Sequence, residues 1–388
     1  MRKLATLQQI EKLEPIKNAD RIEKASIKGW DVVVQRGLYT VGSWVVFHEI
    51  DSAFPVGLEP YHSDLAVRGT KETQLEDESI VKVYVIKSLK LRDVISQGYC
   101  VPISKYSEEI QQELNKNLKK DFDVTKLLGV LKYEKPEPKG SVAYVPKTKK
   151  EIFKFKFRKW LERNLPTFFK PQKTSGHFPV WIKKTDAVRI QNYKQEMYAK
   201  YLANKVFNVT YKLDGSSITI AKKDKKLYTC SRNLNKNLKI TNDSFVRVSL
   251  PIHESLKKQA TQYCFQGEFV SPSIQQNFEG VSKEEVYIFS AWDITNQVHL
   301  NPLEVIRLCK LYKLKHVPVL HEKITLKELF PNVIDADDLL KQMLKYADGP
   351  SGLKGKYREG LVYKECEDGY LPIKTISNSY LLKYKDEE

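Results

Sequence analysis

The chain has 388 residues, which is too long for one ordinary hydrophobic core and predicts two domains with room for an appendage. Hydrophobic residues make up 41% of it, yet its longest apolar runs, such as WDVVV and WVVF, are far too short to cross a bilayer. Lys and Arg total 65 against 48 Asp and Glu, so the formal net charge of +17 favours a polyanionic partner, although a merely soluble basic surface explains it equally well.

Two further features bear on where the protein acts. The amino-terminal stretch MRKLATLQQIEKLEP has no apolar core followed by a cleavage site, so we expect a soluble, intracellular protein without membrane association. The five cysteines are odd in number and scattered without CxxC spacing, which argues against a disulfide framework and against a zinc site.

Residues 1–130 alternate short β-rich runs with turn signals, as in SIKGWDVVVQRGLYTVGSWVVFHEIDSAFP. Short strands at close spacing predict a small barrel or sandwich, and an OB-like β-barrel would suit a basic nucleic-acid binder. Trp30, Tyr39 and Trp44 could stack on bases, although aromatic residues in strands more often fill a barrel core.

Residues 131–180 form a basic segment in which Lys and Arg outnumber Asp and Glu 13 to 4 and prolines recur. Within it, EIFKFKFRKWLERNL predicts a helix with Phe153, Phe157, Trp160 and Leu161 on one face. One interpretation is a linker whose helix packs on a neighbouring domain, and the other is a clamp of lysines and aromatics on a nucleic-acid backbone.

Residues 181–388 mix strand-like runs such as SSITIA and EVYIFSAWDI with helical segments such as QNYKQEMYAKYLAN, which predicts an α+β domain. Its most informative stretch is NVTYKLDGSSITI, where Lys212 ends a strand and Gly215 lets the backbone turn without a Cβ clash. Lys212 is either an ordinary charge at a hairpin or a nucleophile. A nucleophilic lysine needs burial or a neighbouring positive charge that lowers its pKa from about 10.4.

Further candidate site residues follow in order along the chain. Arg232 follows a strand-like YTC, Glu268 lies in GEFV, and Tyr287 and Phe289 share one face of a strand. Glu359 begins EGLVYK, and Lys374 lies in PIKTIS. Two carboxylates can hold a divalent cation, basic residues can neutralise phosphates and an aromatic ring can stack on a base. Salt-bridged glutamates and surface lysines explain each residue singly but not their order.

The order K-x-D-G, S-R-N, G-E-F, an aromatic strand ending in D-I, E-G-L-V and a final lysine resembles the covalent nucleotidyltransferases. This superfamily contains ATP-dependent polynucleotide ligases and mRNA capping guanylyltransferases. The resemblance covers residues 181–388 and implies an ATP-grasp-like ligase domain of antiparallel sheets and helices. It implies that Lys212 attacks the α-phosphate of ATP to form lysyl-AMP. AMP then passes to the 5′-phosphate of a polynucleotide, and an adjacent 3′-hydroxyl displaces it.

The resemblance also implies roles for the other residues. Glu359 would bind or orient Mg²⁺ or Mn²⁺, with Asp214 and Glu268 as helpers, and Lys374 would grip the α-phosphate. The residues implied to bind ATP are Lys184, Thr185, Arg189, Asp214, Gly215, Arg232, Glu268 and either Phe289 or Tyr287 as the ring stacked on adenine. The last motif commonly reads K-x-K, and here Lys374 has Ile376 two residues after it, so a second lysine would have to be Lys383 or Lys385.

Domain order narrows the resemblance. Capping enzymes and DNA ligases generally place an OB domain after the catalytic domain, whereas this chain ends fourteen residues beyond Lys374 and has its β-rich part in front. PIKNADRIEKASIKGWDVVVQRG and LKLRDVISQGYCVP resemble the amino-terminal OB domain of one family of ATP-dependent RNA ligases. We therefore expect a monomeric RNA ligase that seals 3′-OH and 5′-phosphate ends at nicks in duplex RNA. The alternatives are a DNA or mixed-duplex ligase and a non-catalytic RNA-binding protein of the same fold.

Overall fold

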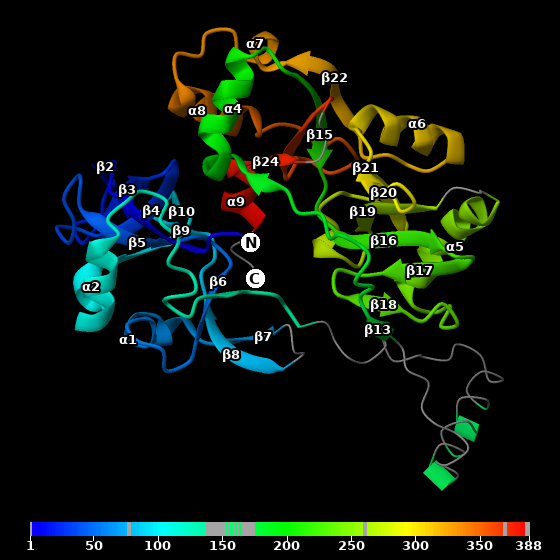
Figure 1. Cartoon of the computed structure of the whole chain (residues 1–388), viewed down its shortest axis with the longest axis horizontal. Coiled ribbons are helices and arrows are strands. Elements are labelled where there is room, and N and C mark those ends of the chain that lie inside the picture. Colours follow the sequence, from blue (N-terminus) through cyan, green and yellow to red (C-terminus); the bar gives the residue numbers. More distant parts are fainter. Residues whose placement is uncertain are drawn as a thin grey trace.

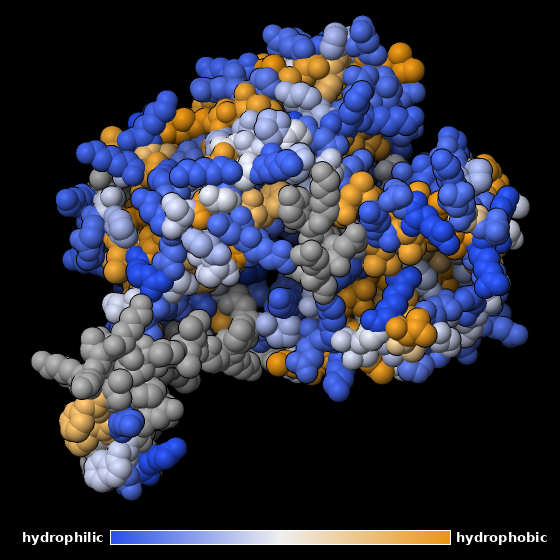
Figure 2. All heavy atoms as spheres, turned by 180° about the vertical axis from the view of Figure 1, so that it is seen from behind, coloured by the Kyte–Doolittle hydropathy of each residue, from blue (hydrophilic) through white to orange (hydrophobic). Residues whose placement is uncertain are grey.

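The computed structural model describes residues 2–75, 79–136, 153, 156–157, 160, 163–164, 175–258, 262–367 and 371–384. Two domains are formed, and the first lies beside the second (Figure 1). Hydrophilic residues dominate the face seen in Figure 2, and smaller hydrophobic patches interrupt them. Within the described residues, no helix is both long and apolar enough to cross a membrane.

The first domain is built from short strands and three short helical segments, followed by one longer helix. The strands are β1 (Ala5–Gln9), β2 (Lys12–Pro15), β3 (Ile22–Ile27), β4 (Trp30–Gln35), β5 (Trp44–His48), β6 (Ser52–Pro55), β7 (Lys71–Gln74), β8 (Ile80–Val85), β9 (Leu89–Leu91), β10 (Val94–Ser96), β11 (Tyr99–Pro102) and β12 (Leu131–Lys132). The helices are α1 (Tyr61–Leu65), η1 (Ala66–Arg68), η2 (Ile103–Lys105) and α2 (Glu108–Lys116).

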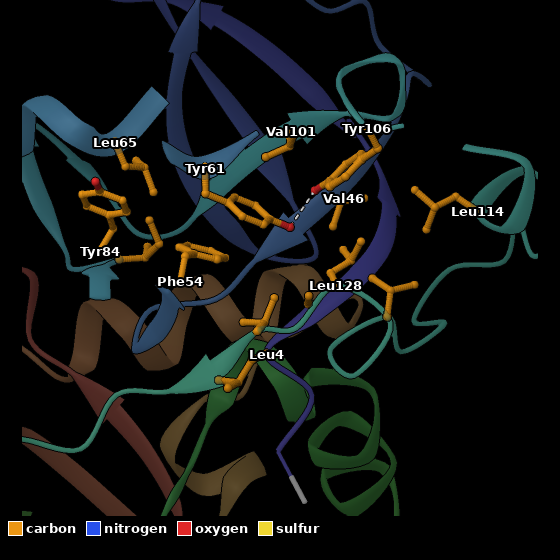
Figure 3. Close-up of a cluster of buried hydrophobic side chains, with 14 of the residues drawn as sticks. Leu4, Val46, Phe54, Tyr61, Leu65, Tyr84, Val101, Tyr106, Leu114 and Leu128 are labelled. Carbon is orange, nitrogen blue, oxygen red and sulfur yellow. Dashed lines mark hydrogen bonds between the residues drawn. The ribbon is translucent and has the colours of Figure 1, made fainter. Parts of the chain in front are cut away.

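Strand alternation explains the interior of this domain. In β4, Trp30, Val32 and Val34 are buried while Asp31 and Gln35 are exposed, as expected of a strand with one face on a core. The sheets β1-β5-β11, β2-β3-β4 and β12-β6-β8-β7 enclose two clusters of buried apolar side chains. One of these clusters is drawn in Figure 3, where the hydroxyls of Tyr61 and Tyr106 are hydrogen-bonded at 3.1 Å.

The second domain contains two sheets with helices packed on each. Its strands are β13 (Ser175–His177), β14 (Val188–Arg189), β15 (Val206–Lys212), β16 (Ser216–Lys223), β17 (Lys226–Cys230), β18 (Leu234–Lys236), β19 (Tyr263–Val270), β20 (Glu285–Asp293), β21 (Val298–His299), β22 (Val319–Thr325), β23 (Gly360–Glu365) and β24 (Ile373–Ile376). Its helices are η3 (Ile190–Tyr193), α4 (Lys194–Leu202), α5 (Ser244–Lys257), η4 (Gln275–Asn277), α6 (Pro302–Tyr312), α7 (Leu326–Leu329), α8 (Ala336–Tyr346) and α9 (Asn378–Tyr384).

Each of the two sheets packs against helices on one face. The order β13-β18-β17-β16-β19-β20-β21 makes an antiparallel sheet, and its apolar face packs on α5 and α6 through a cluster that contains Ile218, Phe265 and Leu308. The order β14-β24-β23-β15-β22 makes the other sheet, in which only the pairing of β14 with β24 is parallel among the described strands. Helices α4 and α8 cover it, and Met197 and Met343 lie in the shared core (Figure 1). The expected α+β architecture with antiparallel sheets is confirmed.

Contacts between described residues join the domains, and two of them show where. The indole Nε1 of Trp30 donates a hydrogen bond to Oδ1 of Asn192 at 3.1 Å. Ile95 of β10 packs against buried side chains of α9, among them Tyr380 and Leu381. These contacts bring the first domain onto the edge of the second domain where β14, β24 and α9 lie.

The three aromatic residues that the sequence offered for stacking on bases pack into the core of the first domain. Trp30 is 1% exposed, Tyr39 is 7% exposed, and Trp44 packs against a core cluster. The suggestion that these rings stack on bases is therefore wrong for Trp30 and Tyr39, because a base cannot reach a buried ring.

Most of the basic segment 131–180, including its predicted helix residue Leu161, lies outside the described residues. Among those described, Phe153, Phe157 and Trp160 are exposed, and their rings stack in succession with centroids 6.3 and 6.1 Å apart. Strand β12 pairs with β6 of the first domain, and β13 pairs with β18 of the second. The three-part division at residues 130 and 180 stays a prediction.

Candidate active site

The turn that carries Lys212 connects the two sheets of the second domain. Lys212 ends β15 opposite Gly360 of β23, whereas β16 pairs with β17 and β19 in the other sheet. The interpretation of this stretch as a hairpin is wrong, since β15 and β16 do not pair. The turn therefore places the lysine at the junction between two sheets.

Gly215 is required by this crossing. A Cβ at this position would lie 2.5 Å from the backbone carbonyl oxygen of Phe269, closer than side chains approach. The backbone of the turn can lie against β19 only because residue 215 has no side chain. This contact seats the Lys212–Gly215 turn on the strand that carries Glu268.

Carboxylates surround the Lys212 amine. Its Nζ lies 2.6 Å from Oε2 of Glu359, and Glu268 and Asp214 are close enough to act on it electrostatically. Burial alone lowers the pKa of Lys212, but the attraction of Glu359, Glu268 and Asp214 outweighs it, so the pKa is raised. The lowering of the pKa that a nucleophilic lysine needs is therefore not seen, and the amine is held as an ammonium ion.

Two of the nearby carboxyl groups have pKa values raised in turn. Burial, followed by the repulsion of Glu359 and Asp214, raises the pKa of Glu268 to about 8 despite the opposing charge of Lys212. Burial and the same neighbours raise the pKa of Glu279 to about 7. The site therefore holds more acidic groups than one lysine can neutralise.

Glu279 was not expected from the sequence. Its Oε1 accepts a hydrogen bond from the backbone N–H of Asp214 at 2.8 Å, and its Oε2 accepts one from the Ser351 hydroxyl at 3.3 Å. It lies in the turn before Gly280, where the sequence NFEG does not distinguish it from a surface glutamate. Its carboxylate holds the backbone of the Lys212 turn from below.

A cavity of about 200 Å³ lies between the two sheets, next to Lys212. It contains five other residues that the sequence predicted: Thr185, Arg232, Glu268, Phe289 and Lys374. It is also lined by residues that the sequence did not single out, including Asp186, Ser217, Ser290 and Lys364. An aromatic ring, several cations and carboxylates thus converge on one space.

The structure distinguishes the two aromatic candidates. Phe289 lines the cavity, and the Lys364 ammonium lies 5.7 Å from the centre of its ring while donating to its carbonyl oxygen. Tyr287 is packed in a buried cluster with Leu213 and Val270, and its hydroxyl donates to Glu285 at 2.5 Å. Only Phe289 of the two is among the residues that line the cavity.

The three predicted residues that precede β15 in the chain lie in different parts of the domain. The carbonyl oxygen of Thr185 accepts a hydrogen bond from Arg232 at 3.1 Å at the cavity wall. The Lys184 ammonium donates to Oδ1 of Asn233 at 2.7 Å, and Lys184 is not among the residues that line the cavity. Arg189 lies farther off, where its guanidinium is 5.9 Å from the ring centre of Trp30 in the first domain.

Lys374 of β24 completes the basic side of the site. Its Nζ lies 3.4 Å from Oδ1 of Asp186, and burial lowers its pKa to about 8 against that attraction. The side chain of Lys383 and the whole of Lys385 lie outside the described parts of the chain, so a second lysine of this motif stays a prediction.

A second, larger cavity of about 970 Å³ opens between the two domains. Lys212, Glu359 and Lys374 lie in its wall, as do Arg2 and Asp51 of the first domain. Burial lowers the pKa of Arg189 in this wall to about 10, and its buried Nη1 has no hydrogen-bond partner among the described residues. Lys212 and Lys374 therefore lie where the small and the large cavity meet.

The donor chemistry fits a divalent cation only in part. No group of three or more His, Cys, Asp or Glu residues within the described ranges is arranged to hold a metal ion. Mg²⁺, however, is usually bound by one or two carboxylates together with substrate phosphates. Glu359, Asp214 and Glu268 supply oxygen donors of this kind, and burial, followed by the repulsion of neighbouring carboxylates, raises the pKa of Glu268.

Comparisons with known protein families match both parts of the chain. An OB-fold domain model matches residues 4–103, and an RNA ligase model matches residues 205–385. None of the curated protein sequences matches the chain. The OB-like fold expected for the first domain is thereby confirmed.

Solved structures of Naegleria gruberi RNA ligase are similar over both domains. A variant with AMP and Mn is 30% identical, with a TM-score of 0.74 over 99% of this chain and 100% of that one. A variant with ATP and Mn gives the same values. The enzyme with PPi is 29% identical, with a TM-score of 0.72 over 100% of both chains. The chain therefore belongs to the RNA ligase family, whose members form phosphodiester bonds, and it carries an OB-fold domain ahead of the catalytic domain.

Proposed function

We propose that this protein is an ATP-dependent RNA ligase that seals 3′-OH and 5′-phosphate ends through lysyl-AMP and 5′-adenylated RNA intermediates. The observation that carries the proposal is the position of the Lys212 amine, between a small cavity with an aromatic wall and a large cleft between the domains. One face of the lysine can thus meet a nucleotide while the other side remains open to a polynucleotide. The solved Naegleria gruberi structures with ATP, AMP and Mn support ATP and Mn²⁺ or Mg²⁺ as cofactors.

The small cavity suits the adenosine part of ATP. Phe289 offers a ring face for stacking on the base. Arg232, fixed by its hydrogen bond to the Thr185 carbonyl, and Glu268 offer polar partners for the ribose. Lys184 supports this wall through Asn233, and Tyr287 belongs to the buried cluster against which Phe289 packs.

The phosphates would lie toward Lys212 and Lys374. In the first step Nζ of Lys212 attacks the α-phosphorus, a P–N bond forms, the bond to the bridging oxygen breaks, and pyrophosphate leaves with that electron pair. The ammonium must first lose a proton, and Oε2 of Glu359 at 2.6 Å is placed to accept it. The Lys374 ammonium would stabilise the charge that develops on the α-phosphate.

The carboxylates explain why a divalent cation belongs in this proposal. Glu359, with Asp214 and Glu268 as helpers, would hold it beside the phosphates. A cation bound there would neutralise the carboxylates that raise the pKa of Lys212, and so would favour the free amine.

RNA would occupy the interdomain cleft. Its walls carry both cations and carboxylates: Lys3, Lys28 and Lys120 lie in the first domain and Lys194 in the second, and Lys28 and Lys194 are paired with Asp121 and Asp337 at 2.6 Å. The whole chain carries a net charge of +17. Cations on both sides of a cleft favour a phosphate backbone that runs between the domains. The same proposal includes a monomeric enzyme that acts inside the cell, where ATP is available.

Sealing assays on matched nicked duplexes test the proposal. We expect ATP-dependent sealing of a nick whose two flanking strands are RNA, and no sealing by Lys212→Ala. Equal or faster sealing of an all-DNA nick would favour a DNA or mixed-duplex ligase instead. Binding of RNA without sealing under Mg²⁺ and Mn²⁺ would favour the non-catalytic alternative.

A further inference from the structure

The helix α9, near the carboxyl end of the described chain, makes hydrogen bonds to two segments of the active site. The hydroxyl of Tyr380 donates to Oδ2 of Asp214 at 2.8 Å. The backbone N–H of Ser377, just before the helix, donates to the carbonyl oxygen of Glu359 at 2.9 Å. One turn of chain thus contacts the turn that follows the nucleophile and Glu359, the carboxylate partner of the nucleophile, which lies just before β23.

The start of α9 is fixed from the other side. Oδ1 of Asp348 accepts hydrogen bonds from the Ser377 hydroxyl at 2.5 Å and from the Ser379 backbone N–H at 2.9 Å. The Ser377 oxygen in turn accepts from the Tyr380 backbone N–H at 3.1 Å. Such capping satisfies donors that an α-helix leaves open at its first turn, and it sets the position of the Tyr380 backbone.

The Tyr380 ring is held by packing from both domains. It is 6% exposed and meets the ring of Phe278 edge to face, with centroids 5.0 Å apart. Ile95 of β10, in the first domain, packs against the same cluster, which also contains Ile376 and Leu381. The direction of the hydroxyl is therefore determined by side chains from two domains.

Glu279 and Tyr380 both bind Asp214. Glu279 accepts its backbone N–H, and Tyr380 donates to its carboxylate. Asp214 lies two residues after Lys212, so the two hydrogen bonds fix the turn that follows the nucleophile. A carboxylate that is released from Tyr380 can take other positions beside the amine, and this disfavours a single alignment for attack on the α-phosphate.

We propose that Tyr380 is a positioning residue that holds the Asp214 carboxylate in place for lysine adenylylation, and that the OB-fold domain supports it through Ile95. This inference rests on the proposed function of Lys212. Tyr380 itself does not touch the reacting atoms; it acts through Asp214.

Tyr380→Phe is the direct test, because it removes the hydroxyl and leaves the ring contacts intact. The rate of AMP transfer to Lys212 at saturating ATP should fall on the order of tenfold, with KM for ATP within about twofold of wild type. The thermal midpoint should stay within about 2 °C. Tyr198→Phe is the matched control, since its hydroxyl donates to the Ile334 carbonyl at 3.1 Å on the surface, and it should react at the wild-type rate.

A double-mutant cycle with Asp214→Ala, which removes the acceptor of the Tyr380 hydroxyl, shows whether Tyr380 acts through Asp214. In the Asp214→Ala background, Tyr380→Phe should cause no further loss. The same fractional loss in both backgrounds, or a wild-type rate for Tyr380→Phe alone, would overturn the inference. Ile95→Ala should reduce the rate in the same way, with KM unchanged, and a wild-type rate there would remove the OB-fold domain from the account. If the wild-type protein forms no adduct at all, the proposed function itself fails.

Discussion

Lys364 offers a prediction whose size follows from its burial. It lies in β23 and is 8% exposed, and its ammonium donates to the Phe289 carbonyl oxygen. Burial lowers the pKa of Lys364 from 10.5 to about 8. Replacing it with methionine should therefore stabilise the ligand-free protein at pH 7, although the residue lines the proposed nucleotide cavity.

The direction in which stability changes with pH follows from proton binding at Lys364. Between pH 8 and 10.5 the folded protein binds fewer protons at this site than the unfolded chain, so stability rises with pH across that window. Below pH 8 the full penalty of burying the ammonium applies. At about 1.4 kcal/mol per pKa unit it amounts to about 3 kcal/mol, and losing the hydrogen bond to Phe289 offsets about 1 kcal/mol of this.

Thermal unfolding of wild type and Lys364→Met, without ATP, measures the effect. The variant should melt about 2–3 °C higher at pH 7, and its advantage should shrink by pH 9.5. Lys341→Met, on the exposed face of α8, should change the midpoint little at either pH. A variant that is less stable at pH 7, or an advantage that is independent of pH, would refute the reasoning.

Three other substitutions test the geometry of the site. Phe289→Ala should raise KM for ATP about tenfold through lost stacking. Tyr287→Phe, which lies outside the cavity lining, should leave KM unchanged. ATP titrations in which Tyr287→Phe has the larger effect would contradict the assignment of Phe289. Gly215→Ala should cost about 2 kcal/mol or more of unfolding free energy and most of the adenylylation rate, because its Cβ would lie 2.5 Å from the Phe269 carbonyl oxygen. Gly176→Ala, which meets nothing within 4 Å, is the control, and equal denaturation midpoints for both would count against the close contact. Glu279→Ala should slow adenylylation at least tenfold, because it leaves the Asp214 backbone N–H without its acceptor; a wild-type rate with labelled ATP would show that this contact is dispensable.

The sequence predicted the site residues that lie in short motifs of fixed order along the chain. Lys212, Glu359 and Lys374 lie on β15, next to β23 and on β24 of one sheet, so fixed order along the chain translates into proximity. The choice between Phe289 and Tyr287 could not be made from alternation alone, because residues two apart share one face of a strand. The structure distinguishes them, since Phe289 lines the cavity and Tyr287 is buried in a cluster with Leu213.

The residues that sequence reasoning missed act through long-range contacts. Glu279 and Tyr380 reach Asp214 from positions 65 and 166 residues away, and neither belongs to a recognisable pattern. The hairpin interpretation failed because a strand, a tight turn and a strand look the same in sequence whether the strands pair or enter two sheets. Trp30 and Tyr39 were ambiguous because a stacking ring and a core ring occupy similar strand positions, and burial in the folded protein decides between them.

The central claim is that Lys212 becomes covalently adenylylated, and mass spectrometry of the intact protein tests it most directly. After incubation with ATP and Mg²⁺ or Mn²⁺, wild type should gain about 329 Da, the mass of one AMP group, and the modified peptide should contain Lys212. Lys212→Ala should gain nothing. An adduct that persists in Lys212→Ala, or a wild-type protein that gains no AMP with either metal, would contradict the account.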